Sequence, residues 1–337
     1  MSSVEDRDAG WMVVQSRTAP SSKDPHYGVE LASSTGVYEA VPSGSLELRT
    51  RVHHVADDSP LAMSCARGVA SLMRLHRDRL GRPTLFPRST PVAELWLVPR
   101  PAADPGVGGE TRTSNVYLWD CRFRRSAQEW ARTLAHEWGH LTLPAARGFA
   151  SPEGDAAGHL GEALYMEWLA AETHGDESGD FMTPSVCRMW TERHNSPRWQ
   201  RYQRLGPTDP DLERRDRSGM DAYVGAALGI GASFGSTTLG TVLRGIDNDS
   251  PRELFQSLRR HCAEQEQVLV KLPAWVPLPA GRFRIEGAPG NGILIVDGQR
   301  NRHASDAAGV RFARAGWHRI EAGPGQRTAA SITRMNA

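Results

Sequence analysis

The chain has 337 residues, enough for about two domains, and its 39% apolar and 23% charged residues are typical of a folded protein rather than a disordered one. Its formal net charge is +1, with basic and acidic residues almost balanced, which argues against charge-driven binding to nucleic acid or anionic lipid. The four cysteines lie far apart without a C-x-x-C pair, which excludes a zinc ribbon and favours buried free thiols.

Residues 1–44 are rich in Ser, Gly, Pro and Asp, and we expect an N-terminal extension of uncertain order. The chain as written starts without the basic segment and apolar core of a secretory signal, so we expect it in the cytoplasm. A secreted protein whose leader is missing would have the same sequence.

Alternating apolar residues predict three strands before the first motif of interest, at 45–52, 92–98 and 115–120. A helix is expected between the first two strands, because Ser59 can cap it, Pro60 fits its first position, and Gly81 with Pro83 can end it. The Gly/Pro/Thr-rich segment 101–114 is expected to be a loop.

The next helix begins with the capping box Ser126-x-x-Glu129 and ends before Pro144. The later segments are, in order, a helix at 158–174, an irregular stretch at 175–220, a glycine-rich segment at 222–243 and a charged helix at 251–268. The uncharged glycine-rich segment is long enough to cross a bilayer, but its glycine, Ser and Thr content favours a buried helix pair.

Proline density at 272–279 predicts a linker, and residues 271–337 beyond it form β-type runs separated by turns. We expect a small all-β sandwich there, with Asp297-Gly298 as a hairpin turn. Such appendages resemble accessory domains of extracellular enzymes, which suggests carbohydrate or cell-surface contact. Trp317 could stack on a sugar, although a core position is the better interpretation.

His136 and His140 are four residues apart, so a helix places both imidazoles on one face, where they can hold one cation. Zinc suits imidazole nitrogen and keeps one position open for water in a catalytic site. Glu137, turned about 100° round the helix, can take a proton from that water. The pattern predicts a hydrolytic metal site.

A third protein ligand is expected on the following helix, where Glu162 is our first choice. Asp155, His159 and Glu167 are the alternatives, and Glu167 would point away from a metal that Glu162 faces.

These residues resemble the gluzincin zinc metallopeptidases. The resemblance covers residues 45–270 and rests on His136-Glu137-x-x-His140, on Gly161-Glu162-Ala-Leu-Tyr and on the order of strands and helices. The metzincin pattern fails, because Leu143 and Ala146 stand where it needs Gly and His. The Asn-Glu pair common in gluzincins is Gly161-Glu162 here, which leaves the subfamily open.

The resemblance implies an α+β fold: a zincin-like domain with a small mixed sheet, an active-site helix and a helical subdomain at 45–270, followed by the sandwich. It implies one Zn²⁺ held by His136, His140 and Glu162, with Glu137 as general base. It also implies that the strand 115–119 pairs with an extended substrate, and that Tyr223 stabilises the oxyanion, a role for which Tyr202 competes.

A peptidase acting on peptides or proteins is therefore the leading hypothesis, without nucleic-acid partners or a membrane span. Two alternatives stay open. The chain could be a catalytically inactive zincin-fold binding module, although such a module has no use for Glu137. It could also be a zinc hydrolase of a non-peptide amide or ester.

Overall fold

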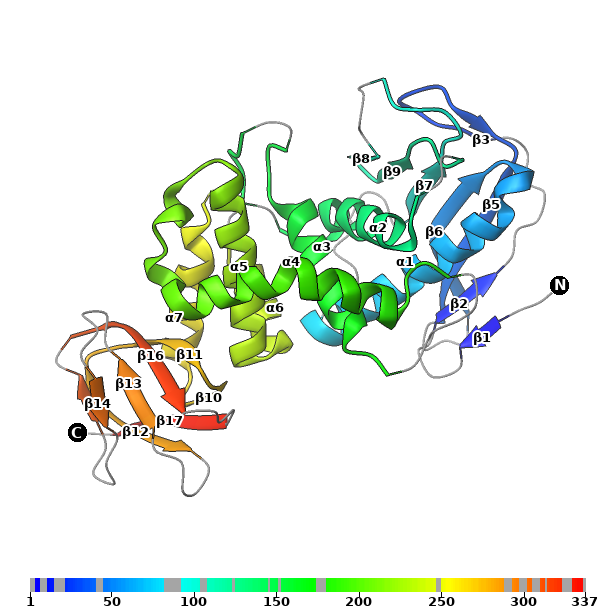
Figure 1. The fold of residues 1–337 in the computed structure, drawn as a ribbon. Helices are drawn as coiled ribbons and strands as arrows, with labels where there is room; N and C mark the ends of the chain where they lie inside the picture. The colour runs from blue at the N-terminus through cyan, green and yellow to red at the C-terminus, as the bar shows by residue number, and fades with distance from the viewer. Residues whose placement is uncertain are drawn as a thin grey trace. The chain divides into compact units, whose positions relative to one another are not determined.

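A computed structural model describes most of the chain (Figure 1). The residues outside the description are 1–3, 7–10, 15–21, 41–44, 82–91, 104–107, 123–124, 145, 151–152, 174–179, 247–249, 288–292, 297–301, 305–309, 313, 323–328 and 336–337. The chain divides into two compact units. The first contains Met1–Leu143 with Ala157–His194, and the second contains Pro144–Ala156 with Asn195–Ala337.

The first unit is built on a mixed seven-stranded sheet with the order β1-β2-β5-β6-β7-β9-β8 (Figure 1). Its strands are β1 (Val4–Asp6), β2 (Trp11–Val14), β5 (Ser33–Ala40), β6 (Leu46–His54), β7 (Ala93–Leu97), β8 (Gly109–Arg112) and β9 (Asn115–Leu118). The β6-β7-β9 pairs are parallel and the remaining pairs are antiparallel. A short hairpin, β3 (Ser22–Lys23) with β4 (Glu30–Leu31), stands apart from this sheet.

Two parts of this sheet differ from the sequence expectation. Strands β1, β2 and β5 come from the first 44 residues, which were expected only as an extension of uncertain order. Strand β8 comes from the segment expected to be a loop, and it forms a hairpin with β9 through Thr113-Ser114. Thr113 has a positive φ of 56°, which closes this tight turn.

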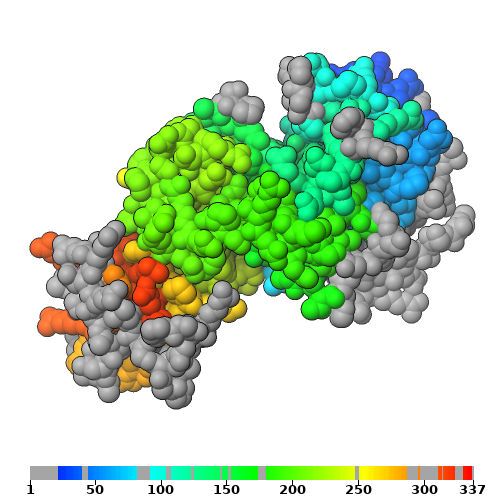
Figure 2. Space-filling model, viewed as in Figure 1, coloured from blue at the N-terminus to red at the C-terminus, as the bar shows by residue number. Residues whose placement is uncertain are grey.

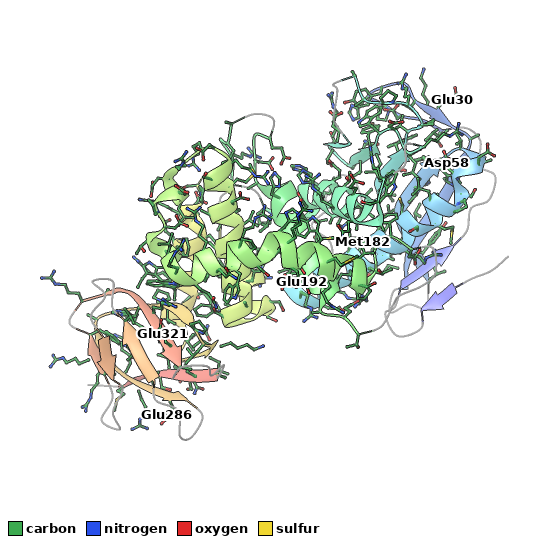
Figure 3. All side chains as sticks on the ribbon, viewed as in Figure 1. Glu30, Asp58, Met182, Glu192, Glu286 and Glu321 are labelled. Carbon is green, nitrogen blue, oxygen red and sulfur yellow. The ribbon has the colours of Figure 1, made fainter. Side chains whose placement is uncertain are left out.

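Helix α1 (Ser59–Leu80) connects β6 to β7 and has the expected ends. Asp58, labelled in Figure 3, occupies the N-cap position, so Ser59 is the first helical residue rather than the cap. Pro60 lies in the first turn, and Gly81 ends the helix in the left-handed region at φ 66°. A buried polar chain joins α1 to the next two helices: His76 Nδ1 lies 2.9 Å from Tyr165 Oη, which lies 2.7 Å from Thr142 Oγ1.

Helices α2 (Ala127–Thr142) and α3 (Ala157–Ala170) follow, both within a residue or a turn of their predicted limits. The prediction of irregular structure at 175–220 is wrong, because α4 (Pro184–Leu205) fills half of it. The boundary between the two units falls inside α4, between His194 and Asn195. Pro197 lies within this helix, and a proline there usually marks a break.

The second unit begins with helices and ends with strands. Helices α5 (Arg217–Phe234) and α6 (Ser236–Arg244) are separated by Gly235, so the glycine-rich segment is a helix pair as expected. Two short 3-10 turns (Gly206–Thr208 and Pro210–Glu213) precede them, and α7 (Arg252–Glu264) follows. Across the residues that the structure describes, no helix is long and apolar enough to cross a membrane.

The C-terminal strands form two four-stranded sheets, in the orders β10-β17-β12-β15 and β11-β16-β13-β14. They appear in yellow to red in Figure 2. Their bounds are β10 (Gln267–Lys271), β11 (Ala274–Leu278), β12 (Gly281–Gly287), β13 (Ile293–Val296), β14 (Arg302–Ala304), β15 (Val310–Phe312), β16 (Gly316–Ala322) and β17 (Ala329–Met335). Both sheets supply one apolar core that includes Val276, Ile285, Ile295, Ile320 and Ile332. The expected all-β C-terminal region is confirmed.

One detail of this region corrects the sequence analysis. The proline-rich segment is not a linker, since Ala274–Leu278 is the fully buried strand β11. Trp317 is half-buried and packs edge-on against Phe255 of α7, with ring centroids 5.4 Å apart; stacking of Trp317 on a sugar stays a prediction. The turn expected at Asp297-Gly298 lies outside the described residues.

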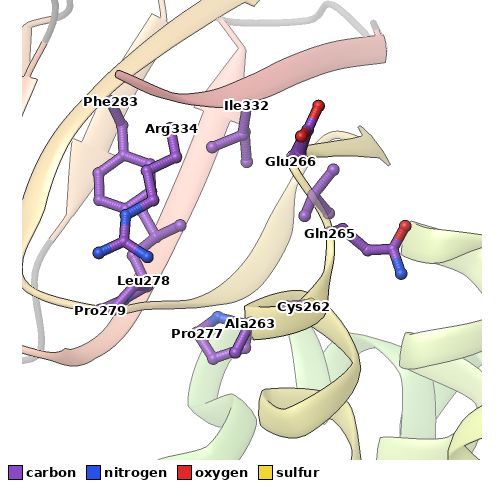
Figure 4. A pocket seen from close by; sticks show the side chains of 11 residues that line it. Cys262, Ala263, Gln265, Glu266, Pro277, Leu278, Pro279, Phe283, Ile332 and Arg334 are labelled. Atoms are coloured by element: carbon purple, nitrogen blue, oxygen red, sulfur yellow. The ribbon is translucent and has the colours of Figure 1, made fainter. Parts of the chain in front are cut away.

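A hollow lies where the end of α7 meets the sandwich, lined by Cys262, Glu266, Pro277, Phe283 and Arg334 among others (Figure 4). Its volume of about 20 Å³ is little more than one water molecule needs. It is therefore too small to be a ligand site. All four cysteines of the chain are buried and free, as expected.

Candidate metal centre

Helix α2 positions the His-Glu-x-x-His motif. Its start is fixed by the predicted capping box: Ser126 Oγ accepts from the Glu129 amide at 3.2 Å, and the Ser126 amide donates to Glu129 Oε2 at 2.7 Å. From this start, the rings of His136 and His140 lie one turn apart with centroids 5.0 Å from each other. His136 is buried and His140 is half-buried.

Two glycines allow α3 to lie directly against α2. A Cβ on Gly139 would lie 2.5 Å from the Ala157 carbonyl oxygen, and a Cβ on Gly161 would lie 2.5 Å from the Ala135 carbonyl oxygen. The two main chains therefore touch where Gly139 and Gly161 cross. This is the physical reason for the Gly161-Glu162 pair, because a larger residue in place of Gly161 would push the helices apart.

Gly158 shows where the two motif histidines point. A Cβ built on Gly158 would be closer to Nε2 of both His136 and His140 than van der Waals contact allows. The two Nε2 atoms therefore converge on one space beside Gly158. Convergent imidazole nitrogens are the donors that a zinc ion prefers.

Glu137 is buried and held by the edge strand β8. Thr111 Oγ1 donates to Glu137 Oε2 at 2.8 Å. Thr111 Oγ1 also lies 3.0 Å from the carbonyl oxygen of Glu137. Gly109 leaves space for the carboxyl group, since a Cβ there would lie 2.7 Å from Glu137 Oε1. Sequence analysis missed both contacts because the strand itself was not recognised.

Glu162 projects from α3 into the same buried region and uses both carboxylate oxygens. Its Oε2 lies 2.8 Å from Nδ1 of His136 and 3.0 Å from Nδ1 of His159. Its Oε1 accepts from Nε of Arg132 at 2.8 Å. Arg132 was not singled out from the sequence. Its position on α2, one turn before His136, could have indicated that it lies near the motif.

Charge and hydrogen bonding keep Glu162 ionised. Burial raises the pKa of its carboxyl group, but the hydrogen bonds from His136 and His159 and the charge of Arg132 together outweigh burial. The pKa is therefore well below its ordinary value.

The described residues thus form a candidate histidine–glutamate metal site. The ligand atoms of His136, His159 and Glu162 all lie within 4.8 Å of one another, and His140 adds its Nε2 beside that of His136. Imidazole and carboxylate donors fit a zinc ion, which accepts both. The buried donors, and the space that Gly158 leaves free, are what such an ion requires.

The remaining predicted residues lie in different places. Glu167 is exposed on α3, as expected if Glu162 faces inward. Asp155 belongs to the second unit, where its backbone forms an isolated bridge with Arg147. Tyr223 also belongs to the second unit, on α5, and is fully buried; burial raises the pKa of its hydroxyl. The competing Tyr202, on α4 in that unit, is buried too.

The expected substrate-pairing strand needs a correction. Strand β9 (Asn115–Leu118) is paired on both sides, with β7 in parallel and with β8 antiparallel. Its backbone groups are therefore already used. Among the described strands, β8 ends the sheet, and it lies beside Glu137.

Comparison with known proteins gives little. No model of a known family matches the chain, and no curated protein matches its sequence. Among solved structures, it is similar to an aminopeptidase A of Legionella pneumophila in complex with aspartic acid, with a TM-score of 0.35 and 8% identity. The match covers 97% of this chain and 41% of that protein, so this chain spans less than half of its length.

Proposed function

We propose that this protein is a zinc-dependent peptidase that hydrolyses peptide bonds, with one zinc ion per chain and Glu137 as general base. The observation that carries the proposal is the convergence of His136 Nε2 and His140 Nε2 beside Gly158, next to a buried and oriented Glu137. A binding module would have no need to hold a carboxylate in that position.

In this proposal, His136 and His140 hold the metal, and Glu162 lies against His136 in the buried site. When bound, zinc supplies Lewis acidity, which acidifies water and polarises a substrate carbonyl. Glu137 takes the proton from the attacking water and passes it to the leaving amine. Thr111 holds Glu137 Oε2 through its hydroxyl, so the proton is accepted at a defined oxygen.

The substrate backbone would be held by β8, which ends the sheet among the described strands and adjoins Glu137. An extended peptide can pair with such an edge through main-chain hydrogen bonds. This arrangement supports a peptide over a small ester, because an ester offers no strand to pair. The assignment of Tyr223 to the oxyanion remains a prediction.

The test uses the full chain, loaded with zinc and freed of excess metal. We expect one zinc per chain by elemental analysis and cleavage of a mixed peptide library near neutral pH. Glu137→Gln should keep the zinc and lose activity by about 10²–10⁴-fold, since it removes the general base. A chain that takes up no zinc, or a Glu137→Gln variant as active as wild type, would contradict the proposal. Zinc binding without any cleavage would favour the binding-module alternative.

A further inference from the structure

The most informative feature outside the proposed chemistry is the way Glu162 contacts its neighbours. The sequence assigns this residue as the third metal ligand. In the structure, both of its oxygens are occupied by protein donors: His136 and His159 at Oε2, and Arg132 at Oε1. A carboxylate that binds zinc needs at least one lone pair directed at the ion.

The distances distinguish a hydrogen-bonded cluster from a ligand set. Two ligands bonded tetrahedrally to one zinc, at about 2.0–2.2 Å each, lie about 3.4 Å from each other. Glu162 Oε2 lies 2.8 Å from His136 Nδ1 and 3.0 Å from His159 Nδ1. These are distances for a proton between the two atoms, and they leave no room for an ion.

Proton bookkeeping on His136 leads to the same result. An ionised carboxylate only accepts hydrogen bonds, so Nδ1 of His136 must carry the proton that it shares with Glu162. A neutral imidazole protonated at Nδ1 has its lone pair on Nε2. Nε2 is the atom that converges with Nε2 of His140 beside Gly158. The bond to Glu162 thus selects the tautomer that the site needs.

Arg132 makes a direct metal bond to Glu162 less favourable. Its guanidinium lies 2.8 Å from Glu162 Oε1 and would repel a divalent ion held by the same carboxylate. The guanidinium does not disturb a carboxylate that serves only as a hydrogen-bond acceptor. It neutralises that carboxylate instead.

We propose that Glu162 is a positioning residue, which accepts the Nδ1 proton of His136 and so directs Nε2 of His136 to the metal, and that it does not bind the metal itself. This inference rests on the proposed zinc site and changes its ligand set. The third protein donor is then another residue.

The experiment compares Co²⁺-substituted and Zn²⁺-loaded full chains of wild type, Glu162→Gln and His140→Ala. We expect Glu162→Gln to bind one metal per chain with about 10–100-fold weaker affinity and an unchanged Co²⁺ absorption band, because its ligand set is intact. His140→Ala, the matched ligand-loss control, should lose or shift that band. Circular dichroism checks that both variants fold.

A second measurement needs no substitution. In ¹⁵N-histidine spectra of the zinc-loaded wild type, we expect His136 to carry its proton on Nδ1 and to bind metal through Nε2. Metal on Nδ1 of His136, or a Co²⁺ band that changes in Glu162→Gln as it does in His140→Ala, would overturn the inference while leaving zinc-dependent hydrolysis intact. A wild-type chain that binds no metal would remove the proposed function and this inference with it.

Discussion

The contact between Gly139 and Gly161 predicts that one methyl group added at the crossing of α2 and α3 will disturb the candidate metal centre. In Gly161→Ala, the new Cβ would lie 2.5 Å from the Ala135 carbonyl oxygen and 2.6 Å from Gly139 Cα. Ordinary contact begins at 3.4 Å, so the gap is about 0.9 Å too short. Both obstacles are main-chain atoms, which cannot rotate away as a side chain can.

The expected magnitude follows from two opposing effects. Alanine is a better helix former than glycine by about 1 kcal/mol, which favours the variant. Overpacking costs about 1–3 kcal/mol, and a backbone obstacle places this site at the upper end. We therefore expect a net destabilisation of about 2 kcal/mol. The helices must also separate, which lengthens the bond between His136 and Glu162 and should weaken zinc binding by at least about tenfold.

The assay combines hydrogen exchange with zinc titration on the full chain. Exchange of the α2 and α3 amides reports on the first unit alone, whereas a global unfolding curve would mix two units. Gly231→Ala in α5 is the control, because its Cβ would meet only the movable side-chain end of Leu239, from α6, at 3.1 Å; the exchange of the α5 amides is followed for this variant. Faster exchange and weaker zinc binding are expected for Gly161→Ala alone. Equal behaviour of the two variants would refute the close helix contact.

Three further predictions concern individual contacts. Thr111→Val removes the hydrogen bond to Glu137, and a hydrogen bond to a charged group contributes about 1.5–3 kcal/mol. We therefore expect kcat to fall at least about tenfold while the zinc content stays unchanged. Equal rates for variant and wild type would count against a role for β8 in holding the general base. Asp24 accepts from the Tyr117 hydroxyl at 2.8 Å and from backbone amides; burial raises its pKa, but these hydrogen bonds outweigh it and lower the pKa overall. Its stabilisation is thus complete above the ordinary carboxyl pKa and lost as pH falls through the lowered one. Hydrogen exchange of the β9 amides, which reports on the first unit, should therefore show a deficit of about 1–3 kcal/mol in Asp24→Asn at neutral pH that closes in acid; a deficit independent of pH would contradict this. The four buried thiols, whose environment raises the pKa of Cys121 to about 12, should react slowly with a thiol reagent in the native chain and fully after denaturation; rapid labelling of the folded chain would show that a thiol is accessible.

The sequence predicted best the features that local chemistry determines. The capping box at Ser126 fixes the start of α2, and with it the helical phase of His136, Glu137 and His140. Four strands of the sandwich, β12, β13, β16 and β17, coincide with β-type runs separated by turn residues, so these runs were visible without a structure.

The missed elements have weak local signals and depend on tertiary contacts. Strand β8 (Gly109–Arg112) is short, without apolar alternation, and is held by pairing with β9 and by Glu137. Helix α4 contains Pro197, a residue that usually breaks a helix, yet the helix continues through it. Strand β11 contains Pro277. The proline is tolerated because β11 is an edge strand of its sheet, where one row of backbone amides needs no partner.

The role of Glu162 was not readable from the sequence for a related reason. Spacing can place a carboxylate on the face of α3 that looks at α2, but it cannot show which ring nitrogen the carboxylate meets. That depends on the helix crossing, which Gly139 and Gly161 set together.

The same crossing restricts the two positions of the motif that the pattern His-Glu-x-x-His leaves blank. Trp138 is fully buried and Gly139 touches Gly161, so neither letter is free to vary in this fold. We expect proteins that descend from a common ancestor with this chain to keep small residues at positions 139 and 161 as a pair. A larger residue at either position would require α2 and α3 to lie further apart. His136 would then have to be oriented in a different way.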